Sequence, residues 1–191
     1  MNDLDCYGMT WRPIKGTFTG DFSGNNFLIR IKQQSETDTH FGLFERLSGT
    51  VQNLMIEATF ISKIIEKRPV IIGAIAAEAF GEFILTNCHL VSNRIRSSFH
   101  IDANDNIIAG GLIGRIVNPK NVIFYIESCS SHSDFHLLGF SHKVIAGGIF
   151  GEALSEVHVS NSVIFNSTLI TYSEVSSLLG YIHYSYFLFV S

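Results

Sequence analysis

Proline, cysteine and long apolar runs are scarce in this sequence, and each shortage excludes a class of protein. Only three prolines accompany sixteen glycines, so glycine and asparagine must form most of the turns. No apolar run reaches the roughly 18 residues that a membrane-spanning helix needs. No basic segment followed by an apolar one opens the chain, so no signal peptide is visible. We therefore expect a folded domain with no membrane span.

Positive charge is also in short supply. The net charge is −4, and neither lysine nor arginine occurs after Lys143, which argues against a nucleic-acid partner. Cys6, Cys88 and Cys129 are odd in number and far apart, so we expect free thiols that serve as small apolar side chains. With 46% apolar and 16% charged residues, the 191-residue chain can bury the core of one domain.

Internal repeats are the strongest positive signal. Four segments that begin at Phe41, Ile72, Gly110 and Gly147 resemble one another, and a partial fifth begins at Ser177. We align their leading glycines at spacings of 31, 38 and 37 residues, which indicates turns of variable length. These leading glycines are Gly42, Gly73, Gly111 and Gly148.

A polar position follows each glycine motif, and an apolar residue stands two places before it. Before and after this polar position, the inward-facing side chains fall on different sets of alternate residues. Because side chains in one strand alternate faces with a period of two, this change indicates a bend. Asparagine tolerates the left-handed backbone conformation that such a bend requires, so we expect these side chains to stack between coils. The alternative is a chance alignment in a chain rich in Asn and Ser. The polar residues are Asn53, Asn87, Ser128 and Asn161, and the apolar ones are Val51, Leu85, Ile126 and Val159.

The repeats predict one all-β domain, a parallel β-solenoid of about four to five irregular coils, because a single short coil cannot bury its apolar face without stacked neighbours. Residues 1–40 form an entry or cap segment, 41–176 the coils and 177–191 a partial terminal coil. A β-sandwich is the alternative, but it favours tight hairpins, and the sequence contains neither Asn-Gly nor Asp-Gly.

The stretch WRPIKGTFTGDFSGNNFLIRI predicts a strand-turn-strand entry into the first coil, with Trp11 as a core or cap aromatic rather than an exposed sugar-stacking residue. Together with GLFERLSGTVQNLMI, GGLIG and GGIFG, it resembles the GLUG-repeat family of bacterial surface and secreted proteins. The entry residues that match are Trp11, Pro13, Ile14, Phe18, Gly20, Phe22, Gly24 and Asn25.

The resemblance implies a right-handed parallel β-helix in an adhesin-like protein that is exposed on the cell surface or secreted. Glu45 and Ala76 depart from the motif where it has a closing glycine, and Ser128 departs where it has asparagine. Because the chain starts inside what resembles an entry segment, we expect a fragment, a truncated gene or a short relative.

Binding residues are expected on the turns 93–106 and 130–143, because the inward positions are used for packing. The His-x-Asp-x-His spacing would also suit a metal site if it lay on one rigid strand face, but a polar strand or loop is the simpler interpretation. The DANDN run lacks the glycine and glutamate of a calcium-binding EF-hand loop, and so predicts a turn. The candidate binding residues are Arg94, Arg96, Asp102, Asp105, His132, Asp134 and His136.

The sequence contains no recognisable catalytic motif. There is no nucleophile elbow and no Walker loop. The acidic residues are spread over different coils, whereas a sugar-cleaving site needs two carboxylates close together. We therefore expect no enzyme, no cofactor and no metal. The carboxylates considered are Asp21, Glu57, Glu82, Glu127 and Asp134.

The sequence thus predicts a non-catalytic binding or adhesion module with a protein or glycan partner. A carbohydrate-active enzyme and a structural or decayed repeat fragment without a ligand are the alternatives. Residues 177–191 are rich in aromatic side chains and contain no Lys, Arg, Asp or Glu. They form either an inward final strand or a surface for end-to-end self-association.

Overall fold

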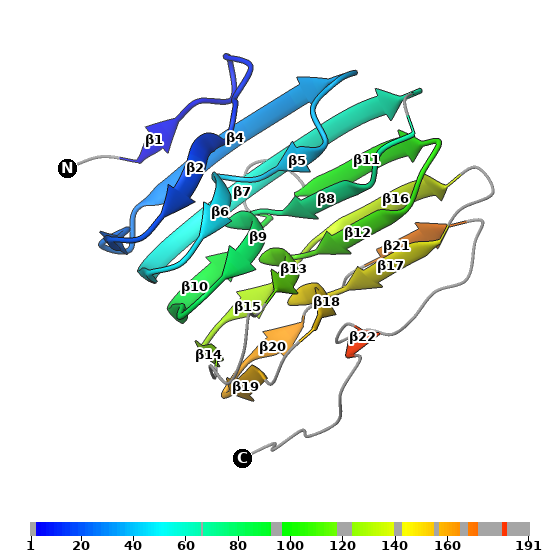
Figure 1. The fold of residues 1–191 in the computed structure, drawn as a ribbon. Coiled ribbons are helices and arrows are strands. Elements are labelled where there is room, and N and C mark those ends of the chain that lie inside the picture. Colours follow the sequence, from blue (N-terminus) through cyan, green and yellow to red (C-terminus); the bar gives the residue numbers. More distant parts are fainter. Residues whose placement is uncertain are drawn as a thin grey trace.

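The computed structural model describes residues 3–65, 67–92, 97–117, 124–139, 143–154, 157–164, 168–171 and 181–182. Over these residues the chain is all-β, with parallel sheets and no helix, so the predicted all-β class is confirmed and the sheets are compatible with a β-helix (Figure 1). It follows that none of the described segments is a helix able to cross a membrane. The two arginines at 94 and 96 and most of the predicted terminal coil 177–191 lie outside the described residues.

The described strands make three parallel sheets, named A, B and C here. Sheet A contains β1 (Leu4–Asp5), β3 (Asp21–Ser23), β4 (Leu28–Ser35), β7 (Thr50–Ile64), β10 (Ile84–Leu90), β11 (Ser98–Ala103), β14 (Phe124–Glu127), β15 (Ser130–Ser131), β16 (Asp134–Gly139), β19 (Val157–Ser160), β20 (Val163–Ile164) and β21 (Thr168–Thr171). Sheet B contains β2 (Ile14–Phe18), β6 (Phe44–Leu47), β9 (Ala76–Phe80), β13 (Ile113–Val117), β18 (Phe150–Ala153) and β22 (Tyr181–Ile182). Sheet C contains β5 (His40–Phe41), β8 (Val70–Gly73), β12 (Ile107–Gly110) and β17 (Val144–Gly147).

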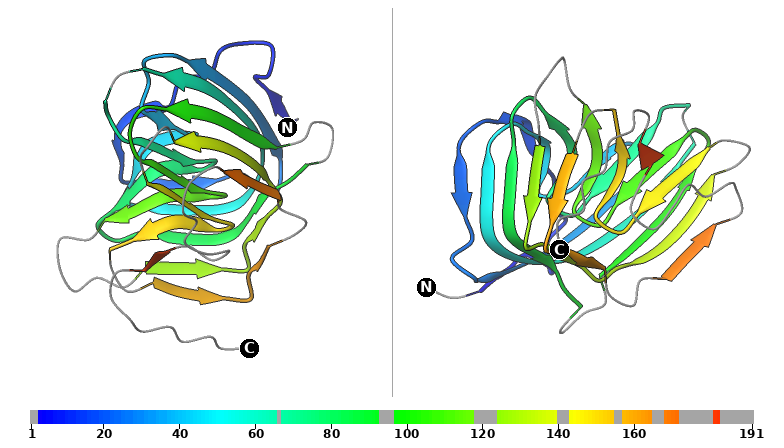
Figure 2. Two further views of the ribbon diagram at one scale, coloured as in Figure 1. Left: turned by 90° about the vertical axis from the view of Figure 1, so that its right-hand side faces the viewer. Right: turned by 90° about the horizontal axis from the view of Figure 1, so that it is seen from below.

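The chain passes through the sheets in a fixed order. From β7 it enters sheet C at β8 and sheet B at β9, then returns to sheet A at β10, one strand further along. The next two passages, through β12 and β13 and through β17 and β18, repeat this order (Figures 1 and 2). We call one such passage a coil, and the passage from β4 through β5 and β6 to β7 is the first coil. Parallel pairing between successive coils is compatible with a β-helix.

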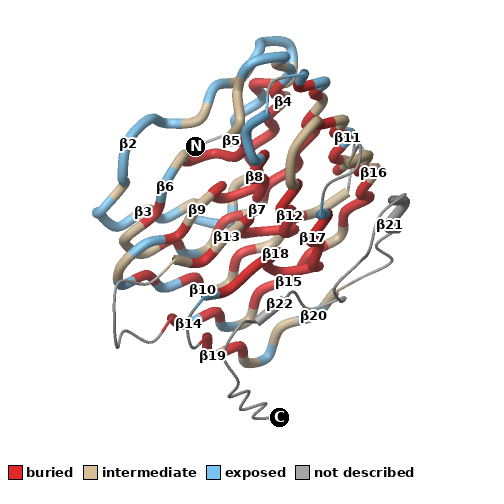
Figure 3. Tube along the Cα trace, turned by 45° about the vertical axis from the view of Figure 1, so that its right-hand side comes forward, coloured by how far each residue is buried: buried red, intermediate tan, exposed pale blue. Residues whose placement is uncertain are grey.

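The predicted apolar column is confirmed. Val51 pairs with Leu85, Leu85 with Ile126, and Ile126 with Val159, each in the neighbouring strand of sheet A. The first three side chains are completely buried, and Val159 is 9% exposed. Successive coils therefore share one interior, and Figure 3 shows the buried residues running through all three sheets.

The polar column forms the corner that the sequence predicted. Asn53, Asn87, Ser128 and Asn161 all have φ between 49° and 53°, in the left-handed region that asparagine tolerates. The Asn87 amide Nδ2 donates a hydrogen bond to Asn53 Oδ1 at 2.8 Å, and Asn26 Oδ1 of the entry segment lies 3.3 Å from the same nitrogen. The side chains therefore bridge neighbouring coils.

The glycine alignment was wrong by one residue. Gly73 pairs with Gly110, and Gly110 with Gly147, so Gly111 is not the partner of Gly73. A Cβ atom on Gly110 would overlap the carbonyl oxygen of Ile113, which leaves no room for a side chain. The same shift places Ala77, and not Ala76, beside Gly114.

Aromatic rings fill the interior between sheets A and C. Phe60 stacks on Phe99 with 4.8 Å between the ring centroids, and Phe99 meets Phe135 edge-on at 5.1 Å. Cys88 and Cys129 are free and buried, as predicted, and the contact with Cys129 together with burial raises the pKa of the Cys88 thiol. Both thiols serve the core as apolar side chains.

Two segments that were expected to be turns are strands. Residues 98–103 form β11 and residues 134–139 form β16, and the two pair in register inside sheet A. The alternation of buried Phe99, Ile101 and Ala103 explains why, because period-two burial is typical of a strand with one face on a core. Of residues 97–106, residues 98–103 form β11, Ser97 precedes the strand and residues 104–106 follow it.

The entry segment is a strand-turn-strand unit, as predicted. β2 pairs with β6, β3 with β7, and β4 runs along β7 from Leu28 to Ser35. Trp11 is partly buried against the core, and its indole Nε1 donates a hydrogen bond to the Gly42 carbonyl at 3.0 Å. Trp11 therefore caps the first coil, which fits the prediction of a core or cap aromatic.

Candidate functional site

The residues predicted to bind a partner are not gathered at one place. Asp102 lies in β11, Asp105 in the turn that follows it, and Asp134 and His136 in β16. His132 lies between β15 and β16. Their expected location on exposed turns is wrong for Asp102, Asp134 and His136, because these residues belong to strands within sheet A. A role in binding stays a prediction for all of them.

The His132, Asp134 and His136 triplet does not make a metal centre. Asp134 is only 3% exposed, and the described residues contain no group of three His, Cys, Asp or Glu side chains that could hold a metal ion. Instead, His136 stacks on His100 of the neighbouring strand, with 4.5 Å between ring centroids and 13° between the planes. This pair follows from the register of β11 and β16.

A ladder of alternating charge crosses sheet B, and the sequence reasoning missed it. Arg46, Glu78, Arg115 and Glu152 occupy matching positions in β6, β9, β13 and β18. Arg46 Nε lies 3.2 Å from Glu78 Oε2, and Arg115 Nε lies 3.0 Å from Glu152 Oε2. Each charge is adjacent to charges of opposite sign, so the ladder is largely neutral and serves the pairing of coils.

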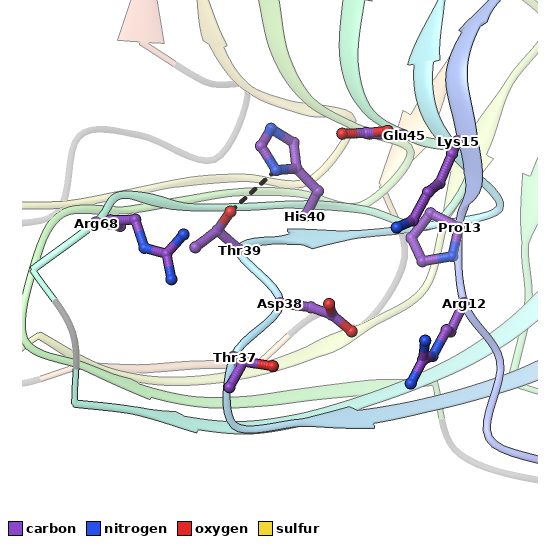
Figure 4. A pocket seen from close by; sticks show the side chains of 9 residues that line it. All are labelled: Arg12, Pro13, Lys15, Thr37, Asp38, Thr39, His40, Glu45 and Arg68. Carbon is purple, nitrogen blue, oxygen red and sulfur yellow. Dashed lines mark hydrogen bonds between the residues drawn. The ribbon is translucent and has the colours of Figure 1, made fainter.

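The first coil carries a polar pocket of about 220 Å³ beside this ladder. Its walls come from the segment before β2 and β2 itself, the β4–β5 turn, β5, β6 and the β7–β8 turn (Figure 4). The lining residues are Arg12, Pro13, Lys15, Thr37, Asp38, Thr39, His40, Glu45 and Arg68.

Local hydrogen bonds fix the β4–β5 turn that forms the floor of the pocket. Ser35 Oγ accepts hydrogen bonds from the backbone N–H groups of Thr37, at 3.2 Å, and Asp38, at 2.9 Å. Gln33, fully buried, donates from Nε2 to the His40 carbonyl at 3.0 Å. A serine hydroxyl that accepts backbone hydrogen bonds a few residues ahead is a common way to hold a tight turn. The turn therefore presents Thr37, Asp38 and Thr39 in a defined arrangement.

His40 connects the pocket to the charge ladder. Its Nδ1 lies 3.1 Å from the Thr39 hydroxyl, and its Nε2 lies 3.8 Å from Glu78 Oε2. The contact with His40, followed by the charge of Arg46, lowers the pKa of Glu78 below its ordinary value although burial acts in the opposite direction. Glu78 is therefore anionic at neutral pH and holds the imidazole from behind the pocket.

Carboxylates and cations both line the pocket. Glu45 accepts a hydrogen bond from the Gly16 backbone N–H at 3.0 Å. Among the residues that the structure describes, no carboxylate forms an ion pair with Arg12 or Lys15. In Figure 4, Arg12 and Lys15 line one side of the pocket, Arg68 lies on the other, and Asp38 lies between them. Cations, carboxylates and hydroxyls can thus all contact one small polar ligand.

Comparison with protein-family models, curated proteins and solved structures finds no match. The resemblance to the GLUG-repeat family therefore stays a prediction from the sequence. The geometry of the pocket and of the coils that hold it is the basis for the function proposed below.

Proposed function

We propose that the protein is a non-catalytic binding module that recognises a glycan through the pocket of its first coil. The scaffold in this proposal is a right-handed parallel β-helix of about four to five irregular coils. Parallel pairing of successive coils supports the helix, and parallel strands joined by a crossover are right-handed in about 98% of cases. As the GLUG-repeat resemblance implies, the module acts at the cell surface or after secretion.

The chemistry of the pocket lining carries the proposal. Seven of the nine lining side chains are charged or carry a hydroxyl, and they are supplied by five chain segments. Sugars are recognised by such groups because each ring presents several hydroxyls that both donate and accept hydrogen bonds. A volume of about 220 Å³ is smaller than drug-sized pockets, which start near ~300 Å³, and suits one sugar residue. A stable protein partner would instead need about 800 Å² of contact surface.

A glycan array probed with the purified protein tests this function, with Asp38→Asn and Asp102→Asn as matched variants. Each variant removes one carboxylate charge, but only Asp38 lines the pocket. We expect Asp38→Asn to weaken glycan binding about tenfold or more, because a hydrogen bond to a charged group contributes about 1.5–3 kcal/mol, and Asp102→Asn to leave it unchanged. If Asp102→Asn weakens binding and Asp38→Asn does not, the binding site lies at β11 instead of the pocket. An array without any signal would overturn the proposal.

A carbohydrate-active enzyme is the second candidate, because Asp38 and Glu45 line the same pocket. Two carboxylates beside one sugar are the basis of glycoside hydrolysis, one acting as an acid and the other as a nucleophile or base. Incubation with the glycans that bind, followed by measurement of new reducing ends, separates the candidates. The binding module produces none. Turnover that is abolished by each of the single variants Asp38→Asn and Glu45→Gln would establish the enzyme instead of the binding module.

A further inference from the structure

We propose that the ligand of this pocket is an acidic sugar, a residue that carries one carboxylate or sulfate group. The inference rests on the proposed glycan-binding function and names the class of glycan. It follows from the positions of the charges in the pocket and from the contacts that some of them already make.

One wall of the pocket is positive although the protein is negative. Arg12 and Lys15 both line this wall. The whole chain has a net charge of −4. A negatively charged group on a ligand can therefore pair with Arg12 and Lys15, and a concave surface concentrates this local field toward the ligand.

The segment before β2 and β2 itself form this positive wall. Arg12 and Lys15 are exposed, and neither forms an ion pair with a described carboxylate. Glu45, which also lines the pocket, already accepts the Gly16 N–H. The planar guanidinium of Arg12 matches a carboxylate or sulfate with two parallel hydrogen bonds, and the ammonium of Lys15 adds a point charge.

The remaining groups suit the neutral part of a sugar ring. Thr37 and Thr39 offer hydroxyls, and Asp38 offers a carboxylate that accepts hydrogen bonds from two adjacent sugar hydroxyls. These groups lie on the β4–β5 turn, across the pocket from Lys15 (Figure 4). The arrangement therefore orients the ring, with its acidic group toward Arg12 and Lys15 and its hydroxyls toward the turn.

Titration calorimetry with trigalacturonate tests the inference, with its carboxyl-reduced form as the matched control. Reduction changes each carboxylate to a primary alcohol and leaves the ring hydroxyls in place. We expect binding to weaken about tenfold or more after reduction, since a charge-assisted hydrogen bond is lost. A sulfated galactose trisaccharide distinguishes the two acidic groups. Preference for either acidic sugar over its neutral form supports the inference.

Three variants locate the interaction. Arg12→Gln and Lys15→Gln should each weaken binding of the preferred acidic trisaccharide about tenfold, Arg12→Lys should restore part of the affinity, and Lys63→Gln should have no effect. Lys63→Gln removes the same positive charge, but Lys63 lies at the exposed end of β7 and does not line the pocket. Thermal unfolding of each variant verifies that the fold is intact.

The outcomes separate this inference from the function on which it rests. If the neutral and acidic trisaccharides bind equally, or if Lys63→Gln weakens binding as much as Arg12→Gln, the acidic-sugar inference is wrong while glycan binding stands. If no glycan binds in the array or the calorimeter, both are wrong.

Discussion

One column of sheet C holds different residues in its first coil and in its later coils. Ile71, Ile108 and Ile145 stack in register on β8, β12 and β17 and are 4%, 2% and 3% exposed. In β5 the same column begins with His40, which lines the pocket and contacts Glu78. Two apolar residues in the first strands of the entry segment are also exposed, Leu4 at 51% and Ile14 at 46%.

Under the proposed function, this difference separates the residues that stabilise the fold from those that recognise a ligand. A residue inside the array has a matching partner in the coil before it and in the coil after it, so its side chain packs on both sides. In sheet C the first coil has no such predecessor among the described strands, because β5 is the edge strand and pairs with β8, and residues 12–15 cover it only in part. Polar side chains can therefore collect there without the cost of burying them in the core. The following changes test this separation, from the largest expected effect on stability to the smallest.

Phe99→Ala should have the largest effect. Phe99 is completely buried between Phe60 and Phe135, so its removal leaves a cavity within the interior of three coils. We expect a loss of about 3–5 kcal/mol in the free energy of unfolding, measured by urea denaturation. Glycan affinity of the protein that remains folded should be unchanged. A loss below 1 kcal/mol would contradict the shared interior.

Asn87→Ala should cost about 1–3 kcal/mol, because alanine is strained at a φ of 52° and the hydrogen bond to Asn53 is lost. Asn87→Gly separates the two causes, since glycine adopts this conformation freely but cannot form the hydrogen bond. Urea denaturation should therefore place the glycine variant between the wild type and the alanine variant. Equal stability of the two variants would mean that the backbone conformation contributes nothing.

Acidification from pH 8 to pH 5 should lower the stability moderately. Burial lowers the pKa of His89, whose ring contacts Asn87 Oδ1 and Ser130 Oγ. Burial, and then the charge of His136, also lowers the pKa of His100, with Asp134 and Asp102 opposing.

As the pH falls below the ordinary histidine pKa near 6.5, His89 and His100 therefore bind protons in the unfolded chain before they do so in the folded one. The free energy of unfolding decreases from that pH down to the lowered pKa values of the folded state. Urea midpoints measured across this range should decline, and a variant with both His89→Gln and His100→Gln should show a flatter profile. Glu78 does not contribute in this window, because its pKa lies below 4.5.

His40→Ile should have the smallest effect on stability. The substitution continues the isoleucine column into the first coil, so we expect the free energy of unfolding to change by less than about 0.5 kcal/mol. Glycan binding should weaken clearly, because the pocket loses a polar wall. The reverse exchange, Ile108→His, should cost about 2 kcal/mol or more, since it buries a polar ring inside the array. Equal costs for both exchanges would contradict the separation of roles.

The corner of each coil was predictable because its physics is local. A left-handed backbone conformation selects Asn among residues with side chains, so Asn53, Asn87 and Asn161 mark the same corner in the sequence. The glycine register was less determined, since two adjacent glycines at 110–111 and at 147–148 permit two alignments. Strand β11 was not predicted because the polar residues before it and the DANDN run after it are typical of turns. The apolar residues Phe99, Ile101 and Ala103 alternate with polar ones, which is the pattern of a strand.

The pocket could not be read from the sequence. Its lining brings Arg12 together with His40 and Arg68, which come from segments about 28 residues apart that lie together only after the first coils have stacked. None of these positions repeats in later coils, so the alignment of repeats gave no signal. The charge ladder was accessible in principle, because Arg46, Glu78, Arg115 and Glu152 each follow a glycine motif at a similar distance.

In sheets B and C, a constant offset among the later coils makes the length of this protein adjustable by whole coils. Gly73 faces Gly110 and Gly110 faces Gly147, 37 residues further on each time, and the pairs Ala76 with Ile113 and Ile113 with Phe150 have the same offset. Residues 74–110 thus form a cassette whose tandem duplication would extend the array by one strand spacing of about 4.8 Å in each sheet. Since the pocket belongs to the first coil, such a graft changes reach while recognition stays the same.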